Sequence, residues 1–285
     1  MHAVLEPREV APGVSMLSLR TPTLPPATHT NAYLVGTGEL VLVEPASPYD
    51  EELARTNDWL DAQLTRGRTL RAIVLTHHHP DHVGGAEAVR ARFGVPIWAH
   101  DRTAQRLAGK LAIDRLLDDG ERIALDGPVP MELEAMHTPG HAPGHLCFYE
   151  PASRSLIAGD MVAAVGTIIV EKHDGDMQQY LASLARMDAR AASQLLPAHG
   201  LPIDDPAAKL AFYVQHRLMR EQKVLAALRG FAGPATLDDL VPVAYADTAQ
   251  AAWPFARMAL EAHLIKLARE GLADQHDGRW LALAA

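Results

Sequence analysis

A dense group of histidines directly after an apolar run is the feature that most restricts the fold of this chain. The run "AIVLT" (72–76) is typical of a strand covered on both faces, and "HHHPDH" (77–82) follows it without a spacer. Histidine is the commonest metal ligand among side chains. The stretch therefore predicts a metal site at the end of a buried strand, with further ligands supplied from elsewhere in the chain.

The further candidate ligands follow later apolar runs. His141 lies in "HTPGHAPGH", Asp160 ends "SLIAGD", and His199 lies in "LLPAHG". Each lies just past the carboxyl end of an apolar run, where the loops of an α/β sheet converge and ligand sites form. We therefore expect these side chains to meet the histidines of 77–82 at one edge of a sheet.

The residue types fit a pair of cations. Two histidines at alternating positions, His77 and His79, can direct their imidazoles at one ion, while Asp81 and His82 face a second. A shared carboxylate would bridge two ions that otherwise repel each other, and such sites hold their ions roughly 3.5–4 Å apart around a hydroxide. Nitrogen ligands suit zinc, and the carboxylates leave iron and manganese as alternatives.

The motifs "THHHPDH", "TPGHAPGH", "AGD" and "PAHG", in this order, resemble the metallo-β-lactamase superfamily. The resemblance implies an α/β fold, an αββα sandwich with a dinuclear site at one edge. Carried over position by position, it implies one metal bound by His77, His79 and His141, and another bound by Asp81, His82 and His199, with Asp160 bridging. The tail resembles the branch that contains the animal β-lactamase-like endoribonuclease and fungal carrier-protein thioesterases.

One position departs from the family pattern. The family commonly ends its second strand with an Asp that is closely followed by Gly, whereas this chain reads "VLVEPAS" with Glu44 at that place. If this carboxylate orients a ligand histidine, the extra methylene has to be accommodated nearby. The role of Glu44 is left open by the sequence.

Short apolar runs alternate with helical patterns over the first two hundred residues, which predicts a layered α/β domain over 1–215. Strands are expected at 31–36, 39–45, 72–76, 96–100, 131–136, 146–150, 155–160 and 194–200, and helices at 50–64, 84–94 and 176–189.

Residues 216–285 are predicted to form a small winged-helix-like domain. Two short helices at 217–230 and 236–245, a longer one at 254–271 and a hairpin turning at Asp277-Gly278 give this outline. From residue 216 on there are eight Lys or Arg and eight Asp or Glu. DNA binding needs several cations on one face, so this balance of charges disfavours it. We expect the domain instead to serve in packing or in formation of a homodimer, and also to form a wall of the cleft.

Composition narrows the choice of function. The formal charge of −9 over 285 residues disfavours general affinity for nucleic acid or an anionic membrane. The single cysteine, Cys147, excludes a disulfide framework and a cysteine-built zinc site. We find no secretory signal and no apolar run near the roughly 20 residues that span a bilayer, so a soluble cytoplasmic protein is expected.

Several residues near the motifs are assigned other roles. His78 is expected to point away from the metals, His137 to lie on the surface or line the pocket, and His145 either to hydrogen-bond behind the ligands or to pack as an ordinary polar residue. Cys147 is expected to be a buried small hydrophobic residue. Two readings remain for 166–176, a solvated loop or a substrate contact through Thr167, Lys172 and His173.

The predicted function is metal-dependent hydrolysis. A bridging hydroxide would attack the acyl carbon of a small ester, thioester or lactone, with Asp81 or a metal-bound water carrying the proton. Two zinc ions are the expected cofactors, and no organic cofactor is expected. The alternatives are a metal-dependent endoribonuclease acting on single-stranded RNA, since the same hydroxide could attack phosphorus, and a non-catalytic metal-binding protein.

Overall fold

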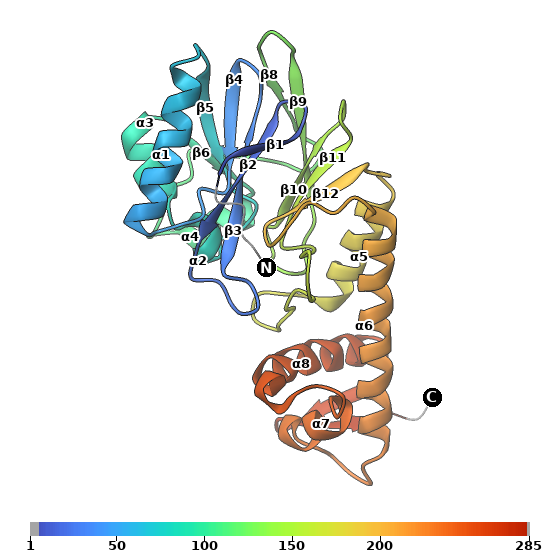
Figure 1. Ribbon diagram of the computed structural model, residues 1–285. Coiled ribbons are helices and arrows are strands. Elements are labelled where there is room, and N and C mark those ends of the chain that lie inside the picture. Colours follow the sequence, from blue (N-terminus) through green and yellow to red (C-terminus); the bar gives the residue numbers. More distant parts are fainter. Residues whose placement is uncertain (1–5, 284–285) are drawn as a thin grey trace.

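Two β-sheets pack face to face between helices in the computed structural model, which describes residues 6–283 (Figure 1). One apolar cluster joins inward-facing residues of both sheets, including Tyr33, Val74 and Phe148. A second lies between the first sheet and its helices, and a third between the second sheet and its helices. This α-β-β-α layering confirms the predicted fold class.

The first sheet has the strand order β1-β2-β3-β4-β5-β6-β7. Its strands are β1 (Arg8–Ala11), β2 (Val14–Arg20), β3 (His29–Val35), β4 (Glu39–Val43), β5 (Thr69–Val74), β6 (Ile97–Ala99) and β7 (Arg115–Leu116). The pairs from β1 to β4 are antiparallel and those from β4 to β7 are parallel. Its helices are α1 (Asp50–Leu64), α2 (Pro80–Val83), α3 (Ala86–Phe93) and α4 (Asp101–Leu107).

The second sheet has the strand order β12-β11-β10-β9-β8. Its strands are β8 (Arg122–Leu125), β9 (Met131–His137), β10 (Leu146–Glu150), β11 (Ser155–Gly159) and β12 (Gln194–Pro197). Only β11 and β12 pair in parallel. Helix α5 (Met177–Asp188) packs on its outer side, where Tyr180 and Leu184 join the apolar cluster of this sheet.

The last third of the chain is a helical unit that is reached along one long helix, α6 (Pro206–Arg229) (Figure 1). It continues with α7 (Leu237–Ala244), the short 3-10 turn η1 (Gln250–Ala252), α8 (Trp253–Arg269) and the hairpin β13 (Ala273–His276) to β14 (Arg279–Ala282). The hairpin turn has positive φ at Asp277 (49°) and Gly278 (75°), as an Asp-Gly turn of this type requires.

Most of the predicted elements are observed, several with bounds shifted by a few residues, and one helix differs greatly in length. Helix α1 has the predicted bounds, and Gly94 ends α3 at φ 67°. The helix expected at 217–230 is instead a 24-residue helix, because Pro206 at its first turn and the Asp205 side chain, which accepts from Ala208 N, begin it eleven residues earlier. The predicted boundary between residues 215 and 216 falls inside this helix. The division into domains 1–215 and 216–285 remains a prediction.

Parallel pairing places the carboxyl ends of β4 and β5 at one edge of the first sheet. In the second sheet, one parallel pair and two successive antiparallel pairs place those of β9, β11 and β12 at one edge as well. Every predicted ligand follows one of these strand ends. Over the described residues, no helix is both long enough and apolar enough to cross a membrane.

Candidate metal centre

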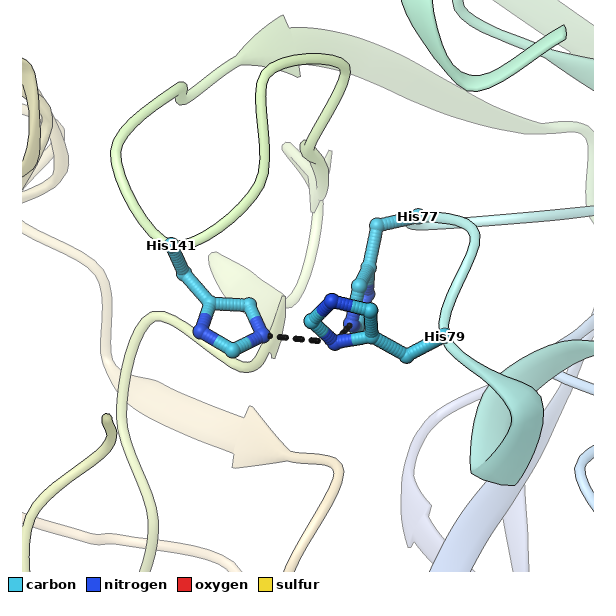
Figure 2. A group of neighbouring side chains, drawn as sticks. All are labelled: His77, His79 and His141. Carbon is cyan, nitrogen blue, oxygen red and sulfur yellow. Dashed lines mark hydrogen bonds between the residues drawn. The ribbon is translucent and has the colours of Figure 1, made fainter. Parts of the chain in front are cut away.

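Three histidines from two loops meet at the edge of the sandwich (Figure 2). His77 and His79 follow β5, and His141 lies in the loop between β9 and β10. The Nδ1 atom of His79 lies 2.9 Å from Nε2 of His77 and 3.0 Å from Nε2 of His141. The three predicted ligands of the first metal position therefore direct one nitrogen each at a common point.

The hydrogen bonds behind two of these rings leave a lone pair on each facing nitrogen when the ring is neutral. Nδ1 of His141 donates to the Ile169 carbonyl at 2.9 Å, and Nε2 of His79 donates to Asp174 Oδ2 at 2.8 Å. Burial, followed by the neighbouring His79, lowers the pKa of His141 to about 4, which keeps that ring neutral at pH 7. With both rings neutral, the facing nitrogens of His79 and His141, 3.0 Å apart, present lone pairs that a cation between them would accept.

A second group brings together Asp81, His82 and His199. Oδ2 of Asp81 lies 3.7 Å from Nε2 of His82 and 3.7 Å from Nε2 of His199. Asp81 and His82 lie on the single-turn helix α2, whereas His199 follows β12. The predicted ligands of the second metal position are thus also adjacent.

Asp160 lies between the two groups. Its Oδ2 atom is 3.6 Å from Nε2 of His141 and 3.6 Å from Nε2 of His82, and its Oδ1 atom is 3.2 Å from Nε2 of His199. Although burial acts in the other direction, the neighbouring rings of His199 and His82 hold the pKa of this carboxyl well below its usual range. An ionised carboxylate between two sets of ligands is what a bridging position requires.

Among the predicted ligands, two buried polar atoms have no hydrogen-bond partner in the described residues, Nε2 of His82 and Oδ1 of Asp160. Buried polar groups are normally hydrogen-bonded, so such atoms call for an explanation. Both belong to predicted ligands and both face the second position. A bound cation would satisfy both, which is why the residues present fit a metal there.

Glu44 holds the second position from behind. Its Oε2 atom accepts a close hydrogen bond from Nδ1 of His82, while Oε1 accepts from the backbone N of Thr76 at 3.0 Å and from the Thr76 hydroxyl. Burial favours the neutral ring, but Glu44, with Asp81 and Asp160, raises the pKa of His82 well above its usual range. Glu44 therefore takes the orienting role that the sequence left open.

The backbone at Glu44 is unusual, since φ is 63° in a residue other than glycine. Asp and Asn tolerate this left-handed region better than longer side chains do. The Asp common at this position in the family would fit it more easily. Here the buried hydrogen bonds to Thr76 and His82 hold Glu44 in this left-handed conformation.

The remaining ligands are also held by groups of the sheet edge. Nδ1 of His77 lies 2.9 Å from the Thr76 hydroxyl, and Nδ1 of His199 donates to the His29 carbonyl at 2.9 Å. Asn31 on β3 donates to the carbonyls of Pro197 and Gly200 at 2.9 and 2.7 Å, which anchors the loop of His199. Neither His29 nor Asn31 was identified from the sequence.

His145 lies directly behind the bridging carboxylate. Its ring is fully buried, and Nε2 accepts from the backbone N of Asp160 at 3.1 Å while Nδ1 lies 2.9 Å from the Thr138 hydroxyl. Of the two roles considered for His145, the structure shows the hydrogen bond behind the ligands.

Asp174 is a further residue that sequence reasoning missed. It accepts from His79, lies 3.1 Å from Nε2 of His78, and pairs with Arg106 at 3.1 Å. Hydrogen bonds from His78 and His79 hold its pKa below the usual range despite partial burial. His78 is therefore engaged with Asp174 and is absent from the two groups that meet at Asp160.

Glycines bring helix α3 close to the loop after β4. A Cβ at Gly84 would lie 2.9 Å from the Ala46 carbonyl oxygen, and one at Gly85 would lie 2.7 Å from that of Pro45. Contacts this short do not occur for a real Cβ, so the close approach requires glycine. It places α2, with Asp81 and His82, directly against the loop that begins with Glu44.

The other residues singled out from the sequence lie outside the centre. His137 stacks on His100 with ring centroids 4.0 Å apart, and Cys147 is buried, which raises the pKa of its thiol to about 12. Of the residues considered for substrate contact, Thr167 lines the cavity described next. Lys172 instead pairs with Glu261 at 2.8 Å, and the His173 carbonyl accepts from Arg106.

A cavity of about 740 Å³ opens over His79, Asp81, Asp160 and His199. Its walls come from the loop 22–29, from residues 163–171 and from the C-terminal helical unit, which contributes Arg220, Tyr245, Phe255 and Met258 among others. The predicted metal centre thus lies in a cavity of the size that holds a small or medium-sized ligand, and the C-terminal unit forms one wall.

The chain belongs to the metallo-β-lactamase superfamily, whose family profile matches residues 25–199. Residues 236–280 match the beta-lactamase-associated winged-helix domain. The protein is a hydrolase of this superfamily, and its His/Asp clusters are typical of the dinuclear site found there. The predicted family and the winged-helix expectation are both confirmed.

Relatives of this chain include two fungal proteins. The lactamase-like protein vrtG of Penicillium aethiopicum is 35% identical over 77% of this chain and 67% of its own length. The atrochrysone carboxyl ACP thioesterase of Aspergillus chevalieri is 34% identical over 70% of this chain, which spans 60% of that protein. Among solved structures, a beta-lactamase domain protein from Burkholderia ambifaria has a TM-score of 0.84 and 23% identity, covering 99% of this chain and 95% of its own.

Proposed function

We propose that this protein is a two-metal hydrolase of small acyl substrates and that both ions are zinc. His77, His79 and His141 would hold one ion, Asp81, His82 and His199 the other, and Asp160 would lie between them. The observation that carries the proposal is the orientation of the imidazoles. The outer nitrogens of His79, His82, His141 and His199 are used by acceptors behind the rings, so the inner nitrogens are free to bind metal.

Bound in this way, the two cations would supply a hydroxide at neutral pH, since metal binding lowers the pKa of water from 15.7 towards about 7. The residues of the chain have separate tasks around it. Asp160 contributes negative charge between the two positions, and Glu44 keeps His82 in the orientation that ligation needs. Asp81, at the cavity wall, would take a proton and pass it to the leaving group as the acyl carbon–oxygen or carbon–sulfur bond breaks.

An ester, thioester or lactone is the substrate class that the surroundings favour. The cavity wall is largely apolar, which suits an acyl group, and a relative that is 34% identical is named as a thioesterase. No serine or cysteine nucleophile is needed. Cys147, the single cysteine, is fully buried and is not among the residues that line the cavity.

The test is hydrolysis of a panel of activated small esters, thioesters, lactones, β-lactams and single-stranded RNA by the zinc-loaded enzyme. We expect acyl hydrolysis that is lost on chelation. His77→Ala and His199→Ala, one from each position, should each lower kcat/KM by several orders of magnitude, because either change removes the pKa effect of the metal pair. His276→Ala serves as the matched control, since this ring lies on the exposed C-terminal hairpin.

Two results would overturn the proposal in different ways. Cleavage of RNA with every acyl substrate untouched would assign the protein to the endoribonuclease alternative. Turnover that survives both His77→Ala and His199→Ala would show that the two metal positions are not the reaction centre.

A further inference from the structure

Residues 163–176, here called the cleft segment, connect β11 to α5 without forming helix or strand at any of their positions, all of which are described. The segment lies between the candidate metal centre and the C-terminal helices, and its residues make hydrogen bonds in both directions. These two sets of contacts are the basis of the inference.

On the metal side, the cleft segment fixes two ligands of the first position. The Ile169 carbonyl accepts from Nδ1 of His141 at 2.9 Å, and Asp174 accepts from Nε2 of His79 at 2.8 Å. The backbone N of Asp176 also donates to the carbonyl of Gly140, next to His141, at 2.8 Å. The orientations of His79 and His141 therefore depend on where this segment lies.

On the other side, helix α6 holds the first part of the segment. The Tyr213 hydroxyl accepts from Ala163 N at 2.8 Å and donates to the Gly166 carbonyl at 3.2 Å. One turn further, the buried guanidinium of Arg217 donates to the carbonyl of Ile168, the residue before Ile169.

Helix α8 holds the second part of the segment through two ion pairs. Lys172 Nζ lies 2.8 Å from Oε1 of Glu261, a carboxylate that is only 11% exposed, and Arg269 pairs with Asp176. These two pairs flank Asp174 in the sequence. The C-terminal helices thus hold the segment on both sides of the residue that orients His79.

The second metal position depends less on the cleft segment, which contacts its ligands through one backbone hydrogen bond, from Ala164 N to the His199 carbonyl at 2.9 Å. His82 is oriented by Glu44 at the end of β4, and His199 by the carbonyl of His29 on β3. Both partners belong to the first sheet or its immediate edge. Residues 172–176, the part of the segment that α8 holds, contact neither His82 nor His199, so their displacement would leave these hydrogen bonds in place.

We infer that the C-terminal helices, through Arg217, Glu261 and Arg269, act as positioning elements for the first metal position and set its affinity independently of the second. The inference rests on the proposed dinuclear centre and gives the C-terminal unit a role in positioning its ligands. Partners that orient metal-bound histidines typically change metal affinity by roughly 10–100-fold when they are removed. An ion pair that acts one step further away should lie at the lower end of this range.

The test measures Co²⁺ affinity by competition with a chromophoric chelator in two backgrounds. His199→Ala removes a ligand of the second position alone, and His77→Ala removes one of the first alone. In each background, Glu261→Lys sets two ammonium groups against each other at the contact with Lys172. We expect the Kd for Co²⁺ to rise about 10-fold in the His199→Ala background, with a change in the visible Co²⁺ bands, and to stay the same in the His77→Ala background.

Two further variants separate positioning from general stability. The swap Lys172→Glu with Glu261→Lys recreates the ion pair and should restore the affinity of the first position. Arg257→Glu breaks the pair between α8 and Asp238, which does not involve the cleft segment, and should change neither position. Equal losses in both backgrounds, or no loss in either, would overturn the inference. Failure of both backgrounds to bind Co²⁺ would instead refute the proposed metal centre itself.

Discussion

The two halves of the candidate metal centre use similar ligands but are held in different ways. Around the second position, His82 and His199 are fixed by Glu44 and by the backbone of His29, at the ends of strands in one sheet. Around the first, His79 and His141 are fixed by an irregular segment that is itself held by helices from the other end of the chain. Ligands whose partners lie at strand ends are held by the packed core, whereas ligands whose partners lie in a loop depend on the contacts of that loop.

This comparison indicates that the two positions can respond separately to change. Metal affinity at the second position should change when the packing of the two sheets is disturbed. Metal affinity at the first position should also change when the packing of the C-terminal unit is disturbed. Asp160 is the exception, because its carboxylate lies within 3.6 Å of ligand nitrogens from both groups.

The largest effect is expected from Asp160→Ala, because this change removes the group that the two positions share. Metal content should fall at both positions together, as measured by elemental analysis after dialysis against a buffered low concentration of zinc. Asp204→Ala, in an exposed loop, is the control. Loss confined to one position would mean that Asp160 is a terminal ligand.

Glu44→Gln should weaken the second position by a factor towards the upper end of the 10–100-fold range. The amide keeps one oxygen for Thr76 but loses the acceptor for Nδ1–H of the buried His82. Zinc titration in the His77→Ala background would measure the change. An equal loss in the His199→Ala background would show that Glu44 acts on both positions through Thr76.

Asp174→Ala should weaken the first position by a factor near the middle of the 10–100-fold range, less than Glu44→Gln because this carboxylate is partly exposed and His79 keeps its place in the loop. Titration in the His199→Ala background is the measurement. The second position should keep its affinity, and a loss there as large as at the first would contradict the separation of the two halves.

The smallest expected effect concerns nucleic acid. The winged-helix region has balanced charges, and its basic residues are largely paired, as Arg220 and Lys223 are with Asp247. We expect the full-length protein to show no salt-dependent binding of duplex DNA near physiological ionic strength in fluorescence anisotropy. Binding that weakens steeply with added salt would give this region a role beyond packing and positioning.

The ligands could be predicted from the sequence because they combine a distinctive residue type with a position at a strand end. Predicting His77, His79 and His141 as ligands required no knowledge of side-chain contacts. Asp174 could not be found in the same way, because it lies in an irregular segment and its role depends on a histidine 95 residues earlier in the chain. Which residues hydrogen-bond to the ligands depends on proximity in three dimensions, which the periodicity of the sequence does not indicate.

The fold shows the same division. Apolar runs located the strands of both sheets that carry the site, while β1, β2, β7 and β8 were not predicted. The long helix α6 was predicted only in its second half, although Asp205-Pro206 is a good helix start. The role of α6 in holding the cleft segment comes from Tyr213, in the part that was missed, and from Arg217, the first residue of the part that was predicted.

Elemental analysis of the metal-replete protein is the most direct test of the account. Two sets of three ligands with a carboxylate between them predict close to two transition-metal ions per chain, with zinc as the ion taken up, and loss of both on treatment with a strong chelator. Fewer than one ion per chain after metal-replete expression would contradict the dinuclear centre on which the proposed hydrolysis depends.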